Sequence, residues 1–487
     1  MSLENTAIQD KPLFEQITPA KRRQVIIAVA FGTFMAPLDS SVVNIALPNI
    51  SSHFQAPLTT VEWVVMAYLL MTSSLLLTFG RMGDMYGHKR IYLTGFGIFT
   101  AGSLLCALSP TILFLIFCRA VQAIGAGMMM SMGPAIVTDV TPPQERGKAL
   151  GAVAVSVSVA LAAGPVVGGF LTAKFGWPSI FYINLPIGIM AILLGQKVIP
   201  STRAKEAQPF DIKGSVTIFT ALIMLLLPLS YAERAGWSNP YILGSLAVGL
   251  ALLVFFVYVE NRIEFPMMDL SLFRNRLFFM SNLSALLSYM AMFFVFLLMP
   301  FYLQQLRHLS PAAAGLLLIP SPLTMMLVAP VFGAVSDRVD TRYISSLGMA
   351  IMTFGIWLIS SLKVDSPVYI IIIGMIIIGM GSGMFQTPNN SAIMGVVPPN
   401  RRGIAASLLA TMRNLGMVLG VAISGAVFSS QLSYLNKSLA AKGLSAAEVK
   451  VGAFTGAMHV SFLVAAAITA VAVVTSLIRG ANKPVGR

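Results

Sequence analysis

Long apolar stretches alternate with short polar connections along almost the whole chain. Windows of about 20 apolar residues, the length that crosses the hydrocarbon core of a bilayer, predict 14 spans. The longest polar connections lie at 200–213, 260–277 and 431–453. The pattern therefore predicts an all-α polytopic membrane protein. The expected spans are 25–47, 61–80, 91–108, 111–136, 148–172, 178–198, 214–232, 241–259, 278–301, 313–335, 343–362, 367–393, 403–430 and 454–478.

Composition and charge agree with this pattern. Hydrophobic residues make up 56% of the chain and charged residues 10%, whereas soluble domains carry about 25% charged residues. The net charge of +14 is explained better by basic residues gathered on one membrane face than by nucleic acid. With a cytoplasmic N-terminus, 23 of the 32 basic residues fall on the cytoplasmic side and 7 fall outside. We therefore expect a multi-pass protein of the cytoplasmic (inner) membrane with both termini in the cytoplasm and no nucleic-acid partner.

The chain carries no signature of an enzyme or of a resident cofactor. The phosphate-binding pattern GxxxxGK[ST] and the zinc pattern HExxH are absent. Four scattered histidines and two cysteines, Cys106 and Cys118, make neither a metal cluster nor a disulfide framework. The first 24 residues are polar and contain no cleavable signal peptide, so the first span is expected to stay as an anchor. We expect no cofactor, no metal and no direct use of ATP.

Two segments recur at nearly the same spacing. GRMGDMYGHKR (80–90) is matched by GAVSDRVDTRY (333–343), 253 residues later, and VTPPQERGKA (140–149) by VVPPNRRGIA (396–405), 256 residues later. The chain is therefore expected to consist of two six-helix bundles, spans 1–6 and 9–14, with two inserted helices between them. Parallel halves of this kind, with a site between them near the midplane, are typical of a large class of transporters.

This repeat predicts five regions. A cytoplasmic N-terminal tail (1–24) precedes the N-terminal six-helix bundle (25–200). A linker with the two extra transmembrane helices (201–277) leads to the C-terminal six-helix bundle (278–480), and a cytoplasmic tail (481–487) ends the chain.

Several motifs carry a resemblance to a known family. LDSSVVNIALP (38–48), GRMGDMYGHKR (80–90), RAVQAIGAG (119–127) and GPVVGG (164–169) resemble successive signatures of the major facilitator superfamily. WPSIFYINLPIG (177–188), FDIKG (210–214) and YLQQLRHLSPAAAGLLLIP (302–320) resemble its 14-span drug:proton antiporter branch. The resemblance implies the major-facilitator fold and a multidrug efflux transporter driven by protons. The chain departs from the usual motifs at Met85, His88, Ala123 and Ala160.

An acidic residue, Asp39, lies inside the first apolar span, where charge is costly. It is about 21 Å from the cytoplasmic end of that span, and Arg119 is about 12 Å from the outer end of span 4. In a core of about 30 Å, both lie roughly 10 Å below the outer face, so an ion pair is expected. A neighbouring guanidinium favours the ionised carboxylate and desolvation disfavours it. Asp39 and Arg119 are therefore a candidate proton-coupling site, and the alternative is a static pair that fixes helix packing.

The loop after span 2 is a candidate gate. Its glycines permit a tight turn, and Asp84 can approach a helix N-terminus. In the resembled family this loop holds the two halves together in the outward-open state; the alternative is a simple positive anchor. The expected gating residues are Gly80, Gly83, Asp84, Gly87, Lys89 and Arg90, with Asp337 and Arg338 in the second copy.

Span 5 contains Gly164, Pro165, Gly168 and Gly169. Small residues allow close helix approach, and proline bends a helix, so tight packing alone would account for them. The resemblance gives this motif a second meaning, because it marks exporters in the superfamily. It favours transport in the direction of efflux.

Three further polar residues have two interpretations each. Arg413, roughly 15 Å into span 13, is either a cavity cation or a structural residue paired with carbonyls and Asn389 or Asn390. Glu62 is either a helix-start carboxylate favoured by the macrodipole or an outer-gate or cation-attracting residue. His459 titrates in the physiological range, and its alternative is a hydrogen-bonded histidine at the membrane interface.

Polar or adaptable side chains within the central spans are candidates for a substrate cavity. They are Met35, Asn44, Tyr68, Gln122, Tyr289, Met290, Gln386, Asn389 and Arg413. One buried carboxylate beside a broad apolar and aromatic cavity would suit lipophilic cations.

The sequence thus predicts a proton-coupled antiporter that exports lipophilic, cationic drugs or toxic compounds by alternating access. Its partners are a small-molecule substrate, protons and membrane lipids; an adaptor protein is left open, and a monomer is expected. The same fold would also suit an exporter of a metabolite, lipid, fatty acid or peptide. A non-transporting membrane receptor is the more distant alternative.

Overall fold

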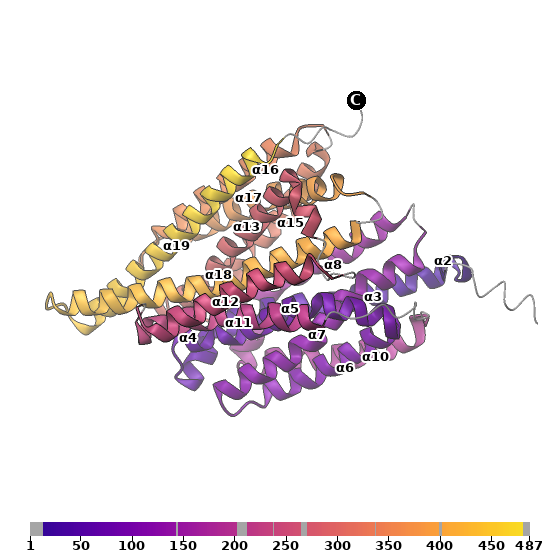
Figure 1. The fold of residues 1–487 in the computed structure, drawn as a ribbon. Coiled ribbons are helices and arrows are strands. Elements are labelled where there is room, and N and C mark those ends of the chain that lie inside the picture. Colours follow the sequence, from indigo (N-terminus) through magenta and orange to yellow (C-terminus); the bar gives the residue numbers. More distant parts are fainter. Residues whose placement is uncertain are drawn as a thin grey trace, which may run out of the picture.

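The computed structural model describes residues 13–142, 145–201, 212–236, 238–263, 270–336, 338–398 and 402–480. Every regular element within these ranges is a helix. Figure 1 shows the helices in two bundles, from the first and last parts of the chain, which lie close together at one end and diverge toward the other. The diverging end holds the first and last described residues, and we call it the terminal end; the opposite end is the far end. The predicted all-α architecture is confirmed.

The N-terminal half is a bundle of six long helices, α3, α5, α6, α7, α8 and α10, with shorter helical turns between them. Thr18 and Thr111 begin two of its helices by accepting hydrogen bonds from the backbone amides of Lys21 and Phe114, which satisfies donors that a helix start leaves open. The elements are α2 (Leu13–Gln16), α3 (Pro19–Phe54), α4 (Leu58–Val61), α5 (Trp63–Tyr86), α6 (His88–Ala107), α7 (Ile112–Val140), α8 (Arg146–Phe175), α9 (Ser179–Tyr182) and α10 (Asn184–Val198).

Two helices follow that belong to neither half. α11 (Ile212–Ala235) and α12 (Pro240–Glu260) pack against each other, and α11 also contacts α5 of the N-terminal half and α18 of the C-terminal half. The inserted pair therefore lies along the seam between the halves.

The C-terminal half is likewise a bundle of six membrane-spanning segments, one of which is divided into α14 and α15. Ser310, Asp340 and Ser445 cap three of its helices with side-chain oxygens. The elements are η1 (Leu270–Arg274), α13 (Arg276–Phe301) with the π-helical turn η2 (Tyr302–Leu306), α14 (Pro311–Leu318), α15 (Pro320–Ser336), α16 (Thr341–Ser360), α17 (Val368–Gly395), α18 (Arg402–Ala440) and α19 (Ala446–Ile478).

The predicted spans coincide with helices throughout. In the described part of the chain, 13 helices are long and apolar enough to cross a membrane, and Val216–Pro228 within α11 is a shorter apolar helix. Helical structure extends into the polar connection 431–453, because α18 continues to Ala440 and α19 begins at Ala446. A helix that passes beyond the hydrocarbon layer becomes polar without ending, so hydropathy alone places its end too early.

The internal repeat is visible in how the helices cross. α6 and α7 approach closely at Gly95 and Gly125; a Cβ added to Gly125 would meet the Gly95 carbonyl oxygen at 2.5 Å. In the C-terminal half, a Cβ on Gly381 of α17 would meet the Gly348 carbonyl oxygen of α16 at the same 2.5 Å. These glycines are separated by the same 253 and 256 residues as the repeated loops. The two halves are therefore built on one helix arrangement.

Contacts between the halves gather toward the far end. Asn49 of α3 donates to Gln304 Oε1 of η2 at 2.6 Å, and Gln304 Nε2 donates to the Ile45 carbonyl at 2.8 Å. α8 packs against α14, and α4 and α5 pack against α18. The far end is therefore closed in this conformation.

Candidate functional site

The charged pair predicted from matching depths is present. Asp39 of α3 and Arg119 of α7 are 1% and 0% exposed, and Arg119 Nη1 donates to Asp39 Oδ2 at 2.5 Å. Arg119 Nε also donates to the Val64 carbonyl oxygen of α5 at 3.0 Å. A buried ion pair is tolerated when further hydrogen bonds satisfy its remaining polar atoms. The neighbouring helices supply most of them, whereas Nη2 of Arg119 has no hydrogen-bond partner among the described residues.

Neutral polar side chains complete the surroundings of the carboxylate. Gln122 Nε2 and Asn184 Nδ2 donate to Asp39 Oδ1 at 3.0 and 2.7 Å, and both amides also donate to Ser103 Oγ, at 2.7 and 3.3 Å. Gln122 Oε1 accepts from Arg119 Nη1 at 2.6 Å. Four helices, α3, α6, α7 and α10, thus converge on one carboxyl group, and we call these five residues the Asp39 cluster.

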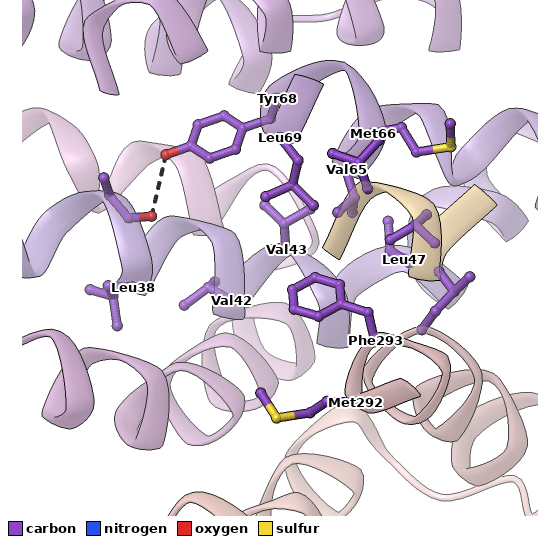
Figure 2. Packing of buried hydrophobic residues seen from close by; sticks show 14 of the residues in the cluster. Leu38, Val42, Val43, Leu47, Val65, Met66, Tyr68, Leu69, Met292 and Phe293 are labelled. Atoms are coloured by element: carbon purple, nitrogen blue, oxygen red, sulfur yellow. Dashed lines mark hydrogen bonds between the residues drawn. The ribbon is translucent and has the colours of Figure 1, made fainter. Parts of the chain in front are cut away.

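Aromatic rings cover the guanidinium of the Asp39 cluster. The Arg119 Cζ atom lies 4.2 Å from the centre of the Tyr68 ring and 5.7 Å from that of Phe181, an arrangement that stabilises a desolvated cation. The Tyr68 hydroxyl donates to the Ala36 carbonyl oxygen of α3 at 3.3 Å, as the dashed line in Figure 2 shows. Tyr68 therefore separates the cluster from the space between the two halves.

A cavity lies on the other side of Tyr68, between the halves. Its volume is about 100 Å³, and both halves line it. The apolar wall includes Met292, Phe293 and Phe296 of α13. Figure 2 shows Met292 and Phe293 in the apolar cluster that also contains Val43 of α3. The lining is thus mostly apolar and aromatic, as in small-molecule sites, but the volume is below the roughly 300–1,000 Å³ of sites that enclose a drug-sized ligand.

Arg413 is the only charged side chain among the described residues that line this cavity. Its Cζ atom lies 5.9 Å from the centre of the Tyr289 ring, and its buried Nε has no hydrogen-bond partner in the described part of the chain. Asp39 does not line the cavity. Of the two interpretations of Arg413, the structure supports the cavity cation.

The candidates for the substrate cavity divide into four groups. Asn44, Tyr68, Tyr289 and Arg413 line it, and Gln386 accepts a hydrogen bond from the Tyr289 hydroxyl at 2.9 Å. Gln122 belongs to the Asp39 cluster instead. Met35 and Met290 are buried away from the cavity lining.

Asn389, the remaining candidate, belongs to a different site. Its Oδ1 accepts from Nη1 of Arg479 at 2.9 Å, and its Nδ2 donates to the Ser281 carbonyl at 3.1 Å. Arg479, 1% exposed, also donates to Thr341 Oγ1 at 2.9 Å and Ser345 Oγ at 3.4 Å. Asn389 therefore pairs with Arg479 and not with Arg413, which was one of the two interpretations of Arg413. Span depth does not tell which way a helix face points.

The glycines of the span 5 motif mediate close helix approaches. A Cβ on Gly164 would overlap Ser41 of α3, and one on Gly168 would meet the Val42 carbonyl oxygen at 2.9 Å. Gly169 faces Pro311 of α14 in the opposite half with no room for a Cβ.

Pro165 lies in the same contact between α8 and α14. The Pro165 carbonyl lies directly against Gly315 of α14, and Pro165 also lines the central cavity. The motif therefore does more than tighten one bundle, because it forms part of the contact between the halves.

The loop motif lies at the terminal end. Gly87 has φ +90° between α5 and α6, a conformation that other residues rarely adopt. Asp84 Oδ1 and Asp139 Oδ2 lie 3.3 and 2.6 Å from the two ring nitrogens of His88. His88, which departs from the usual motif, thus joins α5, α6 and α7 within the N-terminal half.

Other loop residues have local partners. Lys89 Nζ donates to the Gln196 carbonyl at 2.8 Å, Arg90 is exposed, and a Cβ on Gly80 would lie 3.2 Å from Ser131 Oγ. Gly83 faces Met132 and His88. In the second copy, the Arg338 amide donates to the Val335 carbonyl at 3.0 Å, whereas Asp337 lies outside the described residues.

Glu62 and His459 occupy separate places toward the far end. Glu62 is fully buried, and its carboxylate lies where a side chain on Gly425 of α18 would project. His459 of α19 is exposed, and its Nδ1 lies 2.9 Å from the Ser360 carbonyl oxygen. Glu62 is thus part of the contact between the halves, whereas His459 joins two helices of one half.

The chain belongs to the Major Facilitator Superfamily, whose family model matches residues 29–421 and 281–486. It is 39% identical over 417 residues to the riboflavin transporter RibZ of Clostridioides difficile, covering 85% of this chain and 90% of that one. It is 30% identical over 436 residues to the tetracenomycin C resistance and export protein of Streptomyces glaucescens, covering 88% and 81%. The protein is therefore a multi-pass membrane transporter and not an enzyme.

The fold has solved counterparts. A bacterial homologue of the human lysosomal transporter Spinster, in an inward-facing and unoccupied conformation, matches with a TM-score of 0.68 at 14% identity, covering 95% of this chain and 98% of that chain. The D-xylose-proton symporter matches with a TM-score of 0.62 at 13% identity, covering 92% and 96%. At such low identity these structures establish the fold alone.

Proposed function

We propose that the protein is a proton-coupled antiporter that exports small lipophilic compounds by alternating access, with Asp39 as the proton-carrying group. The observation that carries this proposal is the burial of Asp39 against Arg119 and two amide donors, separated from the central cavity by Tyr68. A carboxyl group inside a membrane bundle generally marks an ion or proton pathway. The family membership and the drug-exporting relative favour the same function.

The distribution of basic residues supports a cytoplasmic position for the terminal end. In this orientation the closed far end faces outward, and the conformation is inward-facing. Opening the far end requires the contact of Asn49 with Gln304 and that of Gly169 with Pro311 to separate. The halves then close at the cytoplasmic end, where the loop motif containing Asp84 and His88 lies.

Tyr68 connects substrate binding to the proton site. A compound that enters the cavity contacts Tyr68, whose ring packs on Arg119. A shift of this ring moves the guanidinium relative to Asp39. In the outward-facing state Asp39 binds a proton and the substrate leaves; after the change to the inward-facing state the proton is released, Arg119 pairs with the carboxylate again, and new substrate binds.

The proton gradient supplies enough energy for this cycle. A proton entering across ~100 mV contributes about 2.3 kcal/mol, and each pH unit adds about 1.4 kcal/mol. Together these support a substrate gradient of roughly two to three decades per proton.

Transport into inside-out membrane vesicles tests the coupling. We expect Asp39→Asn to reach the membrane in normal amounts but to lose substrate accumulation driven by the proton gradient. Glu145→Gln is the matched control, because Glu145 is an exposed carboxylate whose ion pair with Arg22 lies at the terminal end. Uphill accumulation by Asp39→Asn at the wild-type level would contradict proton carriage by Asp39. Reduced protein yield without loss of specific activity would instead indicate a static packing pair.

A second candidate function keeps the mechanism but replaces the drug by a metabolite. The riboflavin transporter at 39% identity favours it. Competition of riboflavin with dye export in the same vesicles separates the two functions. Ligand binding without any turnover in sealed liposomes would instead support a receptor.

A further inference from the structure

We propose that the central cavity selects planar aromatic compounds with an anionic or carbonyl-rich edge, and that Arg413 is the residue that binds this edge. The inference rests on the proposed function only in taking the cavity between the halves as the substrate site. It replaces the expectation of cationic substrates with the opposite electrostatic preference.

The charges around the cavity indicate which ligand charge it prefers. Arg413 is the one charged side chain among the described residues that line it, and no described carboxylate lines it. The negative charge of Asp39 is balanced by Arg119 and lies behind Tyr68. The cavity therefore presents an uncompensated positive charge, which attracts electron-rich groups and repels cations.

The unused hydrogen-bonding capacity of Arg413 carries the second step. Its Nε is buried and has no acceptor in the described part of the chain. A buried donor without an acceptor is costly, and a planar guanidinium matches a carboxylate or a pair of carbonyl oxygens with two parallel hydrogen bonds. A ligand acceptor would satisfy this donor.

The aromatic side chains define the rest of the ligand. The Tyr289 ring lies beside Arg413, and Phe293 and Phe296 line the same cavity with their ring centres 5.7 Å apart. Rings of this kind pack against the faces and edges of a flat ring system. Asn44 and Asn414 add amide groups and several side chains add hydroxyls to a mostly apolar lining, so the cavity suits the polar edge of a flat ring system. At about 100 Å³ it encloses only part of such a ligand, because sites that enclose a whole drug-sized ligand measure about 300–1,000 Å³.

Tyr289 is held in place from behind. Its hydroxyl donates to Gln386 Oε1 at 2.9 Å, and Gln386 Nε2 donates to Ser382 Oγ at 2.9 Å. An aromatic wall that is fixed before binding loses little freedom when the ligand arrives. Arg413 and Tyr289 therefore form a preorganised pair, one for the polar edge of the ligand and one for its ring.

Two dyes with the same xanthene ring and opposite charge test the selection. Binding of anionic fluorescein and cationic rhodamine 6G to the purified full-length protein in nanodiscs is measured by fluorescence anisotropy, with riboflavin as an uncharged competitor. We expect fluorescein to bind at least tenfold more tightly than rhodamine 6G, and riboflavin to displace it. Arg413→Gln should weaken fluorescein binding roughly tenfold and leave rhodamine 6G binding unchanged or stronger.

Two further variants control for fold and for general charge. Arg413→Lys keeps the charge without the planar fork and should retain part of the fluorescein affinity. Lys437→Gln removes an exposed charge from the same helix, α18, and should change neither dye.

Three results would overturn the proposal. The first is wild-type protein that binds rhodamine 6G as tightly as fluorescein, which requires no variant. The second is an Arg413→Gln protein with unaltered fluorescein affinity, and the third is an equal loss of affinity for both dyes. Fluorescein binding that depends on Arg413 without proton-driven transport would support the selection and contradict the proposed antiport, so the two failures are distinguishable.

Discussion

The two halves of the transporter cross their helices alike but differ at the positions that lie 256 residues apart in α7 and α17. Arg119 and Gln122 in α7 correspond to Met375 and Ile378 in α17, and all four side chains are buried. In α6 and α16, Ser103 corresponds at an offset of 253 to Ile356, which is fully buried. One bundle therefore encloses a polar cluster where the other has an apolar core.

This difference indicates a division of labour between the halves. The N-terminal half concentrates the groups suited to hold a proton, around Asp39. The C-terminal half has no counterpart of the Asp39–Arg119 pair among its described residues, and it supplies Arg413 and Tyr289 to the cavity instead. We infer that the N-terminal bundle binds the proton and that the C-terminal bundle selects the substrate. Movement of the two bundles relative to each other would then change both the surroundings of Asp39 and the shape of the cavity.

The largest effect is expected from removing the cation of the N-terminal half. Arg119→Met gives α7 the residue type that α17 has at the matching position, but it leaves Asp39 buried without its partner. Breaking a buried ion pair from one side costs about 3–5 kcal/mol. We expect a lower yield and a large drop in thermal stability, measured by unfolding in detergent.

Met375→Leu in α17 is the matched control for this change. A volume-conserving apolar exchange costs less than about 1.5 kcal/mol, so it should unfold close to the wild-type temperature. Equal destabilisation by Arg119→Met and Met375→Leu would refute the contrast between the polar cluster of α7 and the apolar core at the matching positions of α17.

An intermediate and equal effect is expected where the halves are alike. Gly125→Ala and Gly381→Ala each place a Cβ 2.5 Å from a carbonyl oxygen on the neighbouring helix. Such overpacking typically costs about 1–3 kcal/mol. Both variants should lower the unfolding temperature by similar amounts, and a loss confined to one of them would contradict a shared helix arrangement.

The sequence predicted correctly those features that depend on the regular geometry of an α-helix or on the depth of a residue in the membrane. The regular rise of an α-helix placed Asp39 and Arg119 at one level, and the structure joins them. Gln122 lies one helical turn from Arg119, and this spacing is a signal for its place in the cluster.

Tertiary packing determined what the sequence did not predict. Asn184 and Ser103 come from separate helices, and a neutral polar residue in an apolar span carries no sign of its partner. Arg479 resembled one more cytoplasmic basic residue, yet it is buried and donates to side chains of three helices, α13, α16 and α17. Which face of a helix meets a neighbour depends on the rotation of that helix in the bundle, and neither charge nor hydropathy records this rotation.

The smallest effect is expected from removing one neutral hydrogen-bond donor, Asn184, from the Asp39 cluster. Asn184→Ala removes one donor to Asp39 Oδ1 while Gln122 and Arg119 remain. A single hydrogen bond to a charged group contributes about 1.5–3 kcal/mol to stability. Because Asp39 keeps its other donors in this variant, we expect the loss of stability to lie at the lower end of this range. The unfolding temperature should therefore fall by less than in Arg119→Met, and proton-driven transport should be slowed rather than abolished.

The control for this variant lies in the other half. Thr469→Ala removes the acceptor of a 2.9 Å hydrogen bond from Thr353 between α16 and α19, which are in the same positions of their bundle as α6 and α10. The stability loss should be similar, but transport should not change, because the described hydrogen bonds of Thr469, with Thr353 and with the Ala465 and Ala466 carbonyls, involve no ionisable side chain. If Thr469→Ala slowed proton-driven transport as much as Asn184→Ala, the proton site would not be confined to the N-terminal half.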